Sequence, residues 1–146
     1  MQESPLRKAV WNVSKSLFKN LLHKHGGYEI VFAKRGASDR TSALKLALMT
    51  SQERFAEQWG ITVDTSIKVI CSTPSQQVGL QAADYFTWAL QRLYEKDEER
   101  FLNYLWGSVH LVQDIDDKRM TGYGVYYTQK KPLTAATLAW RKKPGI

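Results

Sequence analysis

The segments that decide the fold are residues 28–33, YEIVFA, and residues 67–71, IKVIC. Both are short and rich in β-branched residues, and from Ile30 onward the first is apolar on both faces. Such runs are typical of strands buried inside a parallel sheet. A helical segment separates them, and strands joined through a helix are parallel neighbours in α/β proteins. We therefore expect residues 30–33 and 67–71 to lie side by side and parallel in one sheet.

Helical periodicity surrounds both strands. The helix between them carries an apolar stripe made of Leu44, Leu48, Phe55 and Trp59. Ser38 or Asp39 is expected to cap its start, and Gly60 to end it. Helices are predicted at residues 5–25, about 40–59, 78–94 and 101–109, with a candidate strand at 123–127 and a strand or short helix at 133–140. The predicted order is α-β-α-β-α-α plus a tail, which indicates one α/β layered domain over residues 1–146.

Two strands are too few for a stable sheet, because a two-stranded sheet exposes most of its surface and leaves an edge of unpaired backbone groups. Three explanations stay open. The tail supplies strands, a partner supplies them, or strands that belong before residue 1 are missing. Unless the tail near residues 123–127 covers the edge, we expect either a homodimer through the exposed sheet edge or poor solubility.

Composition excludes several classes of protein. The chain has 146 residues, of which 43% are hydrophobic and 24% charged, values that exclude wholesale disorder. No apolar run is long enough to span a membrane. The single cysteine, Cys71, excludes an internal disulfide and is expected in the core. These features indicate a cytoplasmic protein of bacterial type with no membrane partner.

The chain is basic, with 21 Lys and Arg against 14 Asp and Glu and a net charge of +7. Such a charge favours polyanions, of which nucleic acid is the obvious one, although an inert basic surface has the same composition. Lys34, Arg35 and Arg40 flank one loop and are the candidate phosphate-binding residues. Asp114, Asp116 and Asp117 form either a cation site or a solvated loop, and the loop is favoured because the glycine and spacing of a calcium loop are absent. Tyr123, Tyr126 and Tyr127, beside Lys130 and Lys131, either stack bases or form a strand with buried rings, and the strand is favoured.

The third predicted helix has one polar face and one apolar face. The polar face carries Gln77, Gln81, Asp84, Trp88, Gln91 and Glu95, whereas the apolar face carries Ala82, Phe86, Ala89, Leu90 and Leu93. Asp84 is too far from the ends of the helix to be a cap. It is either a solvated carboxylate beside amides or a functional group.

This helix resembles the late helix of the "domain of unknown function 3800" family, whose members resemble ribonuclease H folds. The family signature Gly-Leu-Gln-x-Ala-Asp-aromatic is matched by Gly79, Leu80, Gln81, Ala83, Asp84 and Tyr85. The segment 35–41, which leads into a helix, resembles a loop in part of the family. The resemblance covers roughly residues 5–130.

The resemblance implies a partial ribonuclease H-like layered fold. Such folds open with three antiparallel strands, and the first carries an Asp-Glu-Ser-Gly motif that does not occur in this chain. The resemblance therefore implies that the first three strands are missing and that the chain is the C-terminal portion, a fragment or a reduced form, of a larger domain.

The resemblance also implies a chemistry. In such folds, carboxylates hold two divalent ions that activate water and stabilise the leaving oxygen of a phosphodiester. Asp84 matches the late-helix ligand, and Asp39 is a candidate second ligand if it is not a helix cap. The implied ions are Mg²⁺ or Mn²⁺, which prefer oxygen ligands. We expect a nuclease-like domain that is incomplete or inactive on its own; the alternative is a non-catalytic module that binds nucleic acid or protein.

Overall fold

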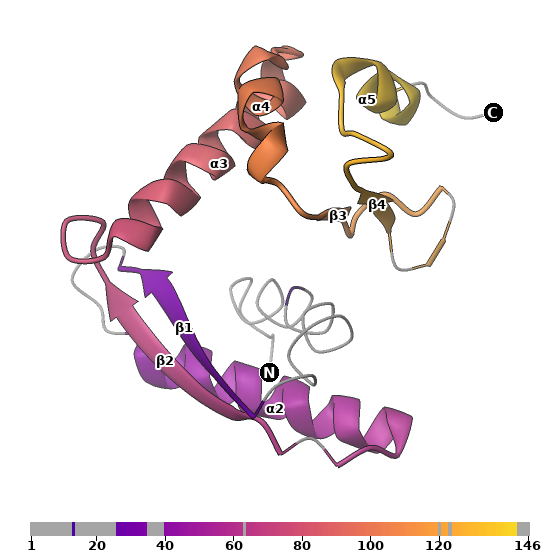
Figure 1. The fold of residues 1–146 in the computed structure, drawn as a ribbon. Helices are drawn as coiled ribbons and strands as arrows, with labels where there is room; N and C mark the ends of the chain where they lie inside the picture. Colours follow the sequence, from indigo (N-terminus) through magenta and orange to yellow (C-terminus); the bar gives the residue numbers. More distant parts are fainter. Residues whose placement is uncertain are drawn as a thin grey trace, which may run out of the picture. The chain divides into compact units, whose positions relative to one another are not determined.

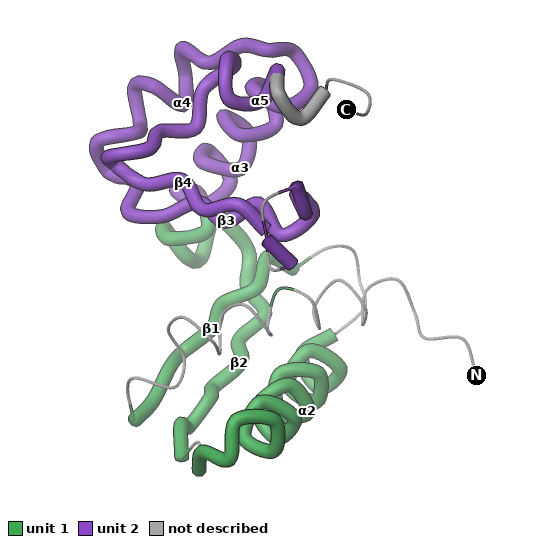
Figure 2. The backbone as a smooth tube through the Cα atoms, turned by 90° about the vertical axis from the view of Figure 1, so that its right-hand side faces the viewer, with its two compact units in different colours: residues 1–80 green, residues 81–146 purple. Residues whose placement is uncertain are grey.

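A computed structural model describes residue 13 and residues 26–34, 40–62, 64–119, 121–122 and 124–142. The chain divides into two compact units, Met1–Leu80 and Gln81–Ile146 (Figure 2). Each unit has its own two-stranded sheet. The first predicted helix lies outside the described residues except for Val13, which is helical.

The first unit is built on a parallel pair of strands. Strand β1 (Gly27–Ala33) pairs with β2 (Ser66–Ser72) in a register that runs from Gly27 opposite Ser66 to Ala33 opposite Ser72. Helix α2 (Thr41–Trp59) connects them and packs against β2 (Figure 1). The predicted parallel pairing is confirmed. The mixed α/β class is confirmed as well.

Helix α2 buries most of its predicted stripe. Leu44, Leu48 and Phe55 are buried, and Phe55 packs against Tyr28, Ile30 and Ile67 of the sheet. The prediction for Trp59 was wrong, because this ring is 52% exposed in the last turn of the helix. Phe55 already fills the contact with the strands, and Trp59 lies against the ring of Phe55 with 6.2 Å between the centroids.

Backbone conformation, and not side-chain capping, marks both described ends of α2. Gly60 ends the helix as predicted, with φ of 61° and its N–H bonded to the carbonyl oxygen of Ala56. At the start, Arg40 occupies the N-cap position and makes no side-chain cap hydrogen bond. Ser38 and Asp39, the predicted caps, lie outside the described residues.

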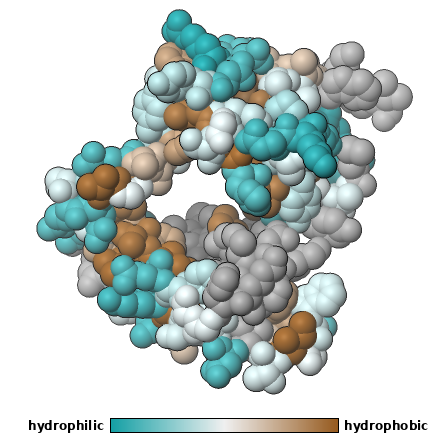
Figure 3. All heavy atoms as spheres, in the orientation of Figure 1, coloured by the Kyte–Doolittle hydropathy of each residue, from teal (hydrophilic) through white to brown (hydrophobic). Residues whose placement is uncertain are grey.

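The strands are less buried than their sequences suggest. In both strands exposed and half-buried residues alternate at first, and Ser72 is the one strand residue that is buried. In the part of the chain that the structure describes, α2 covers one face of this sheet, and hydrophobic residues gather over the strands in the space-filling view (Figure 3). The described residues therefore do not bury these strands on both faces, contrary to the prediction from the sequence.

The second unit is a helical cluster with a short hairpin. Its elements are α3 (Val78–Lys96), which begins in the last residues of the first unit, α4 (Arg100–Leu105), the 3-10 helix η2 (Trp106–Ser108), β3 (Val112–Asp114), β4 (Val125–Tyr127) and α5 (Ala135–Lys142). Strands β3 and β4 are antiparallel. The predicted break between the third and fourth helices is confirmed at residues 97–99, and the predicted strand near residue 125 is confirmed as β4.

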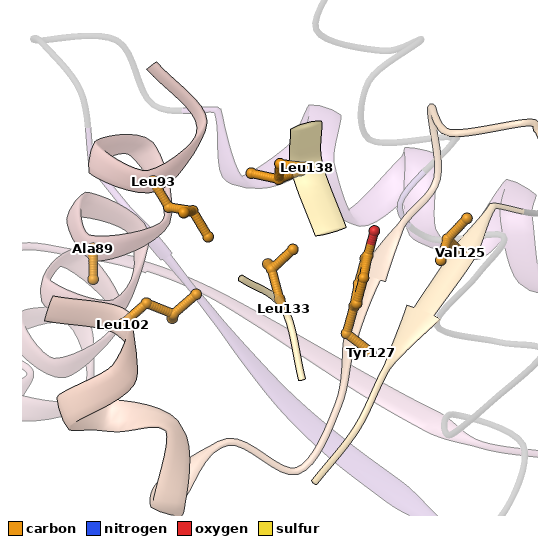
Figure 4. Packing of buried hydrophobic residues seen from close by; sticks show 7 residues of the cluster. All are labelled: Ala89, Leu93, Leu102, Val125, Tyr127, Leu133 and Leu138. Atoms are coloured by element: carbon orange, nitrogen blue, oxygen red, sulfur yellow. The ribbon is translucent and has the colours of Figure 1, made fainter. Parts of the chain in front are cut away.

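One hydrophobic core joins these elements. It consists of Ala89, Leu93, Leu102, Val125, Tyr127, Leu133 and Leu138. In Figure 4, the side chains of Leu93 and Leu102 point toward Leu133. Ala82, which was expected to be buried, is exposed, because the core packs against the later turns of α3.

The described part of the tail does not extend the first sheet. In the described ranges β4 pairs with β3 and β1 pairs with β2, so the two small sheets are separate. Among the described residues, the tail therefore does not supply further strands to the sheet of β1 and β2.

The turn after β3 corrects the prediction of a solvated acidic loop. Asp114 is buried and accepts hydrogen bonds from the N–H groups of Asp116 and Asp117, each at 3.2 Å, and from the Tyr94 hydroxyl at 2.8 Å. Asp117, 2% exposed, forms a two-point ion pair with Arg119 over 2.9 and 2.6 Å. This pairing raises the pKa of the Arg119 guanidinium. Asp114 and Asp117 are therefore structural groups that hold the hairpin.

Candidate metal and nucleic-acid site

Two of the predicted basic residues lie beside the loop that follows β1. The backbone N–H of Lys34 donates to the carbonyl oxygen of Ser72 over 2.7 Å. This bond continues the ladder beyond Ala33, so Lys34 lies at the carboxyl edge of the sheet, where open α/β sheets bind their ligands. Arg40 precedes α2 on the other side of the loop, and both side chains are exposed. Arg35, between them, lies outside the described residues.

The chain then passes from β2 into α3 through a tight turn at the same edge. The N–H groups of Gln76 and Gln77 both donate to the carbonyl oxygen of Thr73 at 3.0 Å. The Thr73 hydroxyl donates to Oε1 of Gln76 over 3.1 Å. This turn brings the segment 78–85, which carries the family-like signature, directly after the carboxyl end of β2.

Asp84 lies in α3, within the second unit, and is exposed. Residues four apart share a helical face, so Asp84, Trp88 and Arg92 follow one another along the same side of α3. The core residues Ala89 and Leu93 occupy the other side. The helix therefore presents a carboxylate, an aromatic ring and a guanidinium in sequence, one turn apart.

Around Trp88 the rings and guanidinium groups form a connected group, which we call the aromatic–arginine cluster: Tyr85, Trp88, Arg92, Glu98, Arg100 and Phe101. Tyr85 stacks on Trp88 with 5.8 Å between ring centroids and 29° between planes. The ring of Phe101 lies 4.5 Å from that of Trp88. The Arg92 guanidinium lies 5.9 Å from the Trp88 ring, and that of Arg100 lies 4.6 Å from the Phe101 ring.

Glu98 holds the two arginines together. Its Oε2 accepts hydrogen bonds from Nε and Nη2 of Arg92, and its Oε1 lies 2.7 Å from Nη2 of Arg100. Hydrogen bonds from Arg92, and secondarily the charge of Arg100, hold the pKa of the Glu98 carboxyl below its ordinary value of 4.5. Glu98 is therefore ionised at neutral pH, and it fixes both guanidinium groups against the rings.

The structure brings only some of the predicted site residues together. Lys34 and Arg40 flank one loop of the first unit, whereas Asp84 belongs to the second unit. Asp39, the candidate second ligand, lies outside the described residues. Across the described ranges, no group of three or more His, Cys, Asp or Glu side chains is placed to hold a metal ion.

Sequence reasoning placed Trp88 on the polar face but missed the cluster around it. The spacing of Tyr85, Trp88 and Arg92 along one helix is a visible signal. Arg100 and Phe101 follow a chain reversal, and the contacts they make across it could not be read from spacing alone.

The first unit also has an open depression of about 920 Å³ at the amino ends of β1 and β2. Its lining includes Gly26 and Ser66, at the amino ends of the strands, with Glu53 and Glu57 of α2. Lys34 and Arg40 are not among its lining residues. It is therefore distinct from the basic loop at the carboxyl edge.

Comparison with family models, with curated proteins and with solved structures finds no match to this chain. Within the described ranges, none of the helices combines the length and hydropathy needed to cross a bilayer.

Proposed function

We propose that this chain contributes to a metal-dependent, ribonuclease H-like domain that processes nucleic acid, similar to the "domain of unknown function 3800" family. The observation that carries the proposal is the position of Asp84 on the helix that follows the parallel strands. A parallel β-α-β unit leads directly into helix α3, which carries the signature Gly79–Tyr85 and an exposed Asp84. A carboxylate on the helix after the last parallel strand is the position that the resemblance assigns to a metal ligand.

The exposed carboxylate of Asp84 is a ligand of the type that a hard divalent cation takes. Asp84 would hold Mg²⁺ or Mn²⁺ through its carboxylate oxygens, the ligands these ions prefer. Asp39, the second candidate ligand, lies outside the described residues. When bound, such ions supply an activated water and stabilise the leaving oxygen of a phosphodiester. Lys34, Arg35 and Arg40 would position the phosphate backbone by charge. Because a site with one or two carboxylates depends on substrate phosphates to complete it, the chain alone is expected to bind metal weakly.

The test is calorimetry with Mn²⁺ on the wild type and on Asp84→Asn, which keeps the shape of the side chain and removes its charge. We expect weak binding to the wild type and affinity reduced roughly tenfold or more in Asp84→Asn, since a direct ligand matters at least as much as the groups that orient ligands. Asp116→Asn, a change at another exposed carboxylate of the same unit, is the matched control and should leave the affinity unchanged.

Equal affinities for the wild type and Asp84→Asn would remove Asp84 from the site. The second candidate function, a non-catalytic module that binds nucleic acid, would then lead. It is favoured by the net charge of +7 and by the exposed Lys34 and Arg40 on either side of one loop. Its distinguishing property is salt-sensitive binding of nucleic acid that persists in the presence of a chelator.

We also propose that a second copy of the chain pairs with the first sheet. In the described part of the chain, β1 and β2 have only each other as neighbours, so each strand has one edge without a further strand. Unpaired strand edges are templates for pairing with another chain.

A further inference from the structure

The aromatic–arginine cluster is separate from the residues that the proposed metal chemistry uses. Tyr85 is 45% exposed and Trp88 39% exposed, although both are large rings on a helix that has a well-formed core on its other side. Aromatic rings are among the most favourable groups to bury, and two exposed rings stacked on each other form a contiguous apolar surface on which a partner can dock.

The platform is held in place before any partner arrives. Phe101 packs against the core of the second unit, and its ring contacts the ring of Trp88. The ring of Tyr85 stacks on Trp88 as well. Because the rings are already ordered, a flat ligand that stacks on them loses little additional conformational freedom in the protein. Such a rigid platform suits planar partners.

Within the cluster, the two guanidinium groups are the points of contact for an anionic partner, and the carboxylate of Asp84 lies one turn from Trp88 on the same helix face. Arg92 and Arg100 contribute two positive charges, and Glu98 neutralises one of them. The Arg100 side chain is 73% exposed, and each guanidinium carries several N–H donors, of which Glu98 engages only some. Arginine held beside exposed aromatic rings is the combination that binds a base and its phosphate together.

We infer that this face of α3 and α4 binds unpaired bases of single-stranded nucleic acid. A base stacks on the exposed ring of Tyr85, at the end of the Tyr85–Trp88 pair, and Arg92 and Arg100 contact the adjoining phosphates. The choice of nucleic acid as the partner rests on the proposed function, and the inference adds a binding surface to that function. Tyr85 and Trp88 follow Asp84 within about one helical turn, so a strand bound on these rings passes beside the proposed metal ligand.

The test compares two fluorescent oligomers of equal length, oligo(dT) and an abasic strand with the same phosphates, by anisotropy in the presence of EDTA. The chelator makes the result independent of metal binding at Asp84. We expect the wild type to bind oligo(dT) about 5- to 150-fold more tightly, the range that corresponds to stacking of one base on an aromatic side chain.

The variants locate this preference. Tyr85→Ala and Trp88→Ala should each reduce the preference for oligo(dT) at least about fivefold. Arg100→Gln should weaken the binding of both oligomers equally. It should also reduce the slope of log affinity against log salt concentration. Tyr104→Ala is the matched control, since Tyr104 is 86% exposed on α4 and is not one of the cluster rings. Circular dichroism checks that each variant is folded, and Trp88→Leu keeps an apolar contact on Phe101 if the alanine variant does not fold.

Three results would overturn the inference. Equal binding of the two oligomers by the wild type would exclude base stacking, and a preference that survives both ring variants would place stacking elsewhere. If neither oligomer binds, the exposed rings are a contact for another protein instead. None of these results alters the Mn²⁺ affinity of Asp84→Asn, so failure of the inference and failure of the proposed function remain distinguishable.

Discussion

Leu93→Ala is expected to lower the free energy of unfolding of the second unit by roughly 2–5 kcal/mol, the range measured for leucine truncations in well-packed cores. Leu93 is 0% exposed and packs in the core with Leu102 and Leu133 (Figure 4). Truncation removes the transfer free energy of the lost methyl groups and leaves a cavity that the surrounding helices fill only in part. Urea unfolding followed by far-UV circular dichroism measures the change.

The control for this variant is Leu46→Ala. Leu46 is 57% exposed on α2, so its truncation should change the free energy of unfolding by no more than about 0.5 kcal/mol. A change below about 1 kcal/mol in Leu93→Ala would mean that α3, α4 and the tail do not share the core described above.

Gly124→Ala is expected to destabilise the β3–β4 hairpin by about 1–3 kcal/mol from backbone strain, and by more once the steric overlap is included. Gly124 has φ of 95°, a conformation that residues with a side chain rarely adopt. A Cβ at this position would overlap the carbonyl oxygen of Asp114. Thermal unfolding of the variant is the measurement.

Gly107→Ala is the matched control for Gly124→Ala. Gly107 does not have a positive φ, and a Cβ there would meet open space among the described residues. Its melting temperature should therefore stay close to that of the wild type. Equal melting temperatures for the wild type and Gly124→Ala would contradict the hairpin geometry at Asp114.

The core of the first unit could be predicted because its signals are local. The β-rich runs and the helical stripe of α2 are dense enough to identify each element, and the connection through a helix implies parallel strands. The exposure of Trp59 could not be predicted in this way, because periodicity says which residues share a face but not where the covering sheet ends.

The tail was harder to predict because its structure depends on distant partners. Strand β3 has only three residues and exists through its pairing with β4. Residues 133–140 were compatible with a strand or a helix, and α5 forms where Glu99 accepts the N–H of Ala135 over 2.8 Å. Asp114 is buried because the Tyr94 hydroxyl reaches it from α3. Such contacts between distant residues leave no periodic trace in the sequence.

In the candidate site, too, local features could be predicted from the sequence, whereas contacts between distant residues could not. The signature around Asp84 is contiguous and could be found by resemblance, and the exposure of Asp84 agrees with its place on the polar face of α3. The Trp88 environment depends on Phe101 and on the pairing of Arg92 with Glu98 after the helix break. Those contacts require the reversal between α3 and α4, which spacing alone does not supply.

The most direct test of the central claim, that Asp84 holds a divalent cation, is paramagnetic broadening by Mn²⁺ in the amide nuclear magnetic resonance spectrum of the whole chain. Substoichiometric Mn²⁺ should broaden the backbone signals of residues 81–88 first, and Asp84→Asn should remove this selective broadening. Broadening that is unchanged in Asp84→Asn, or that centres on other carboxylates such as Glu53 and Glu57, would contradict the assignment of Asp84 as the metal ligand.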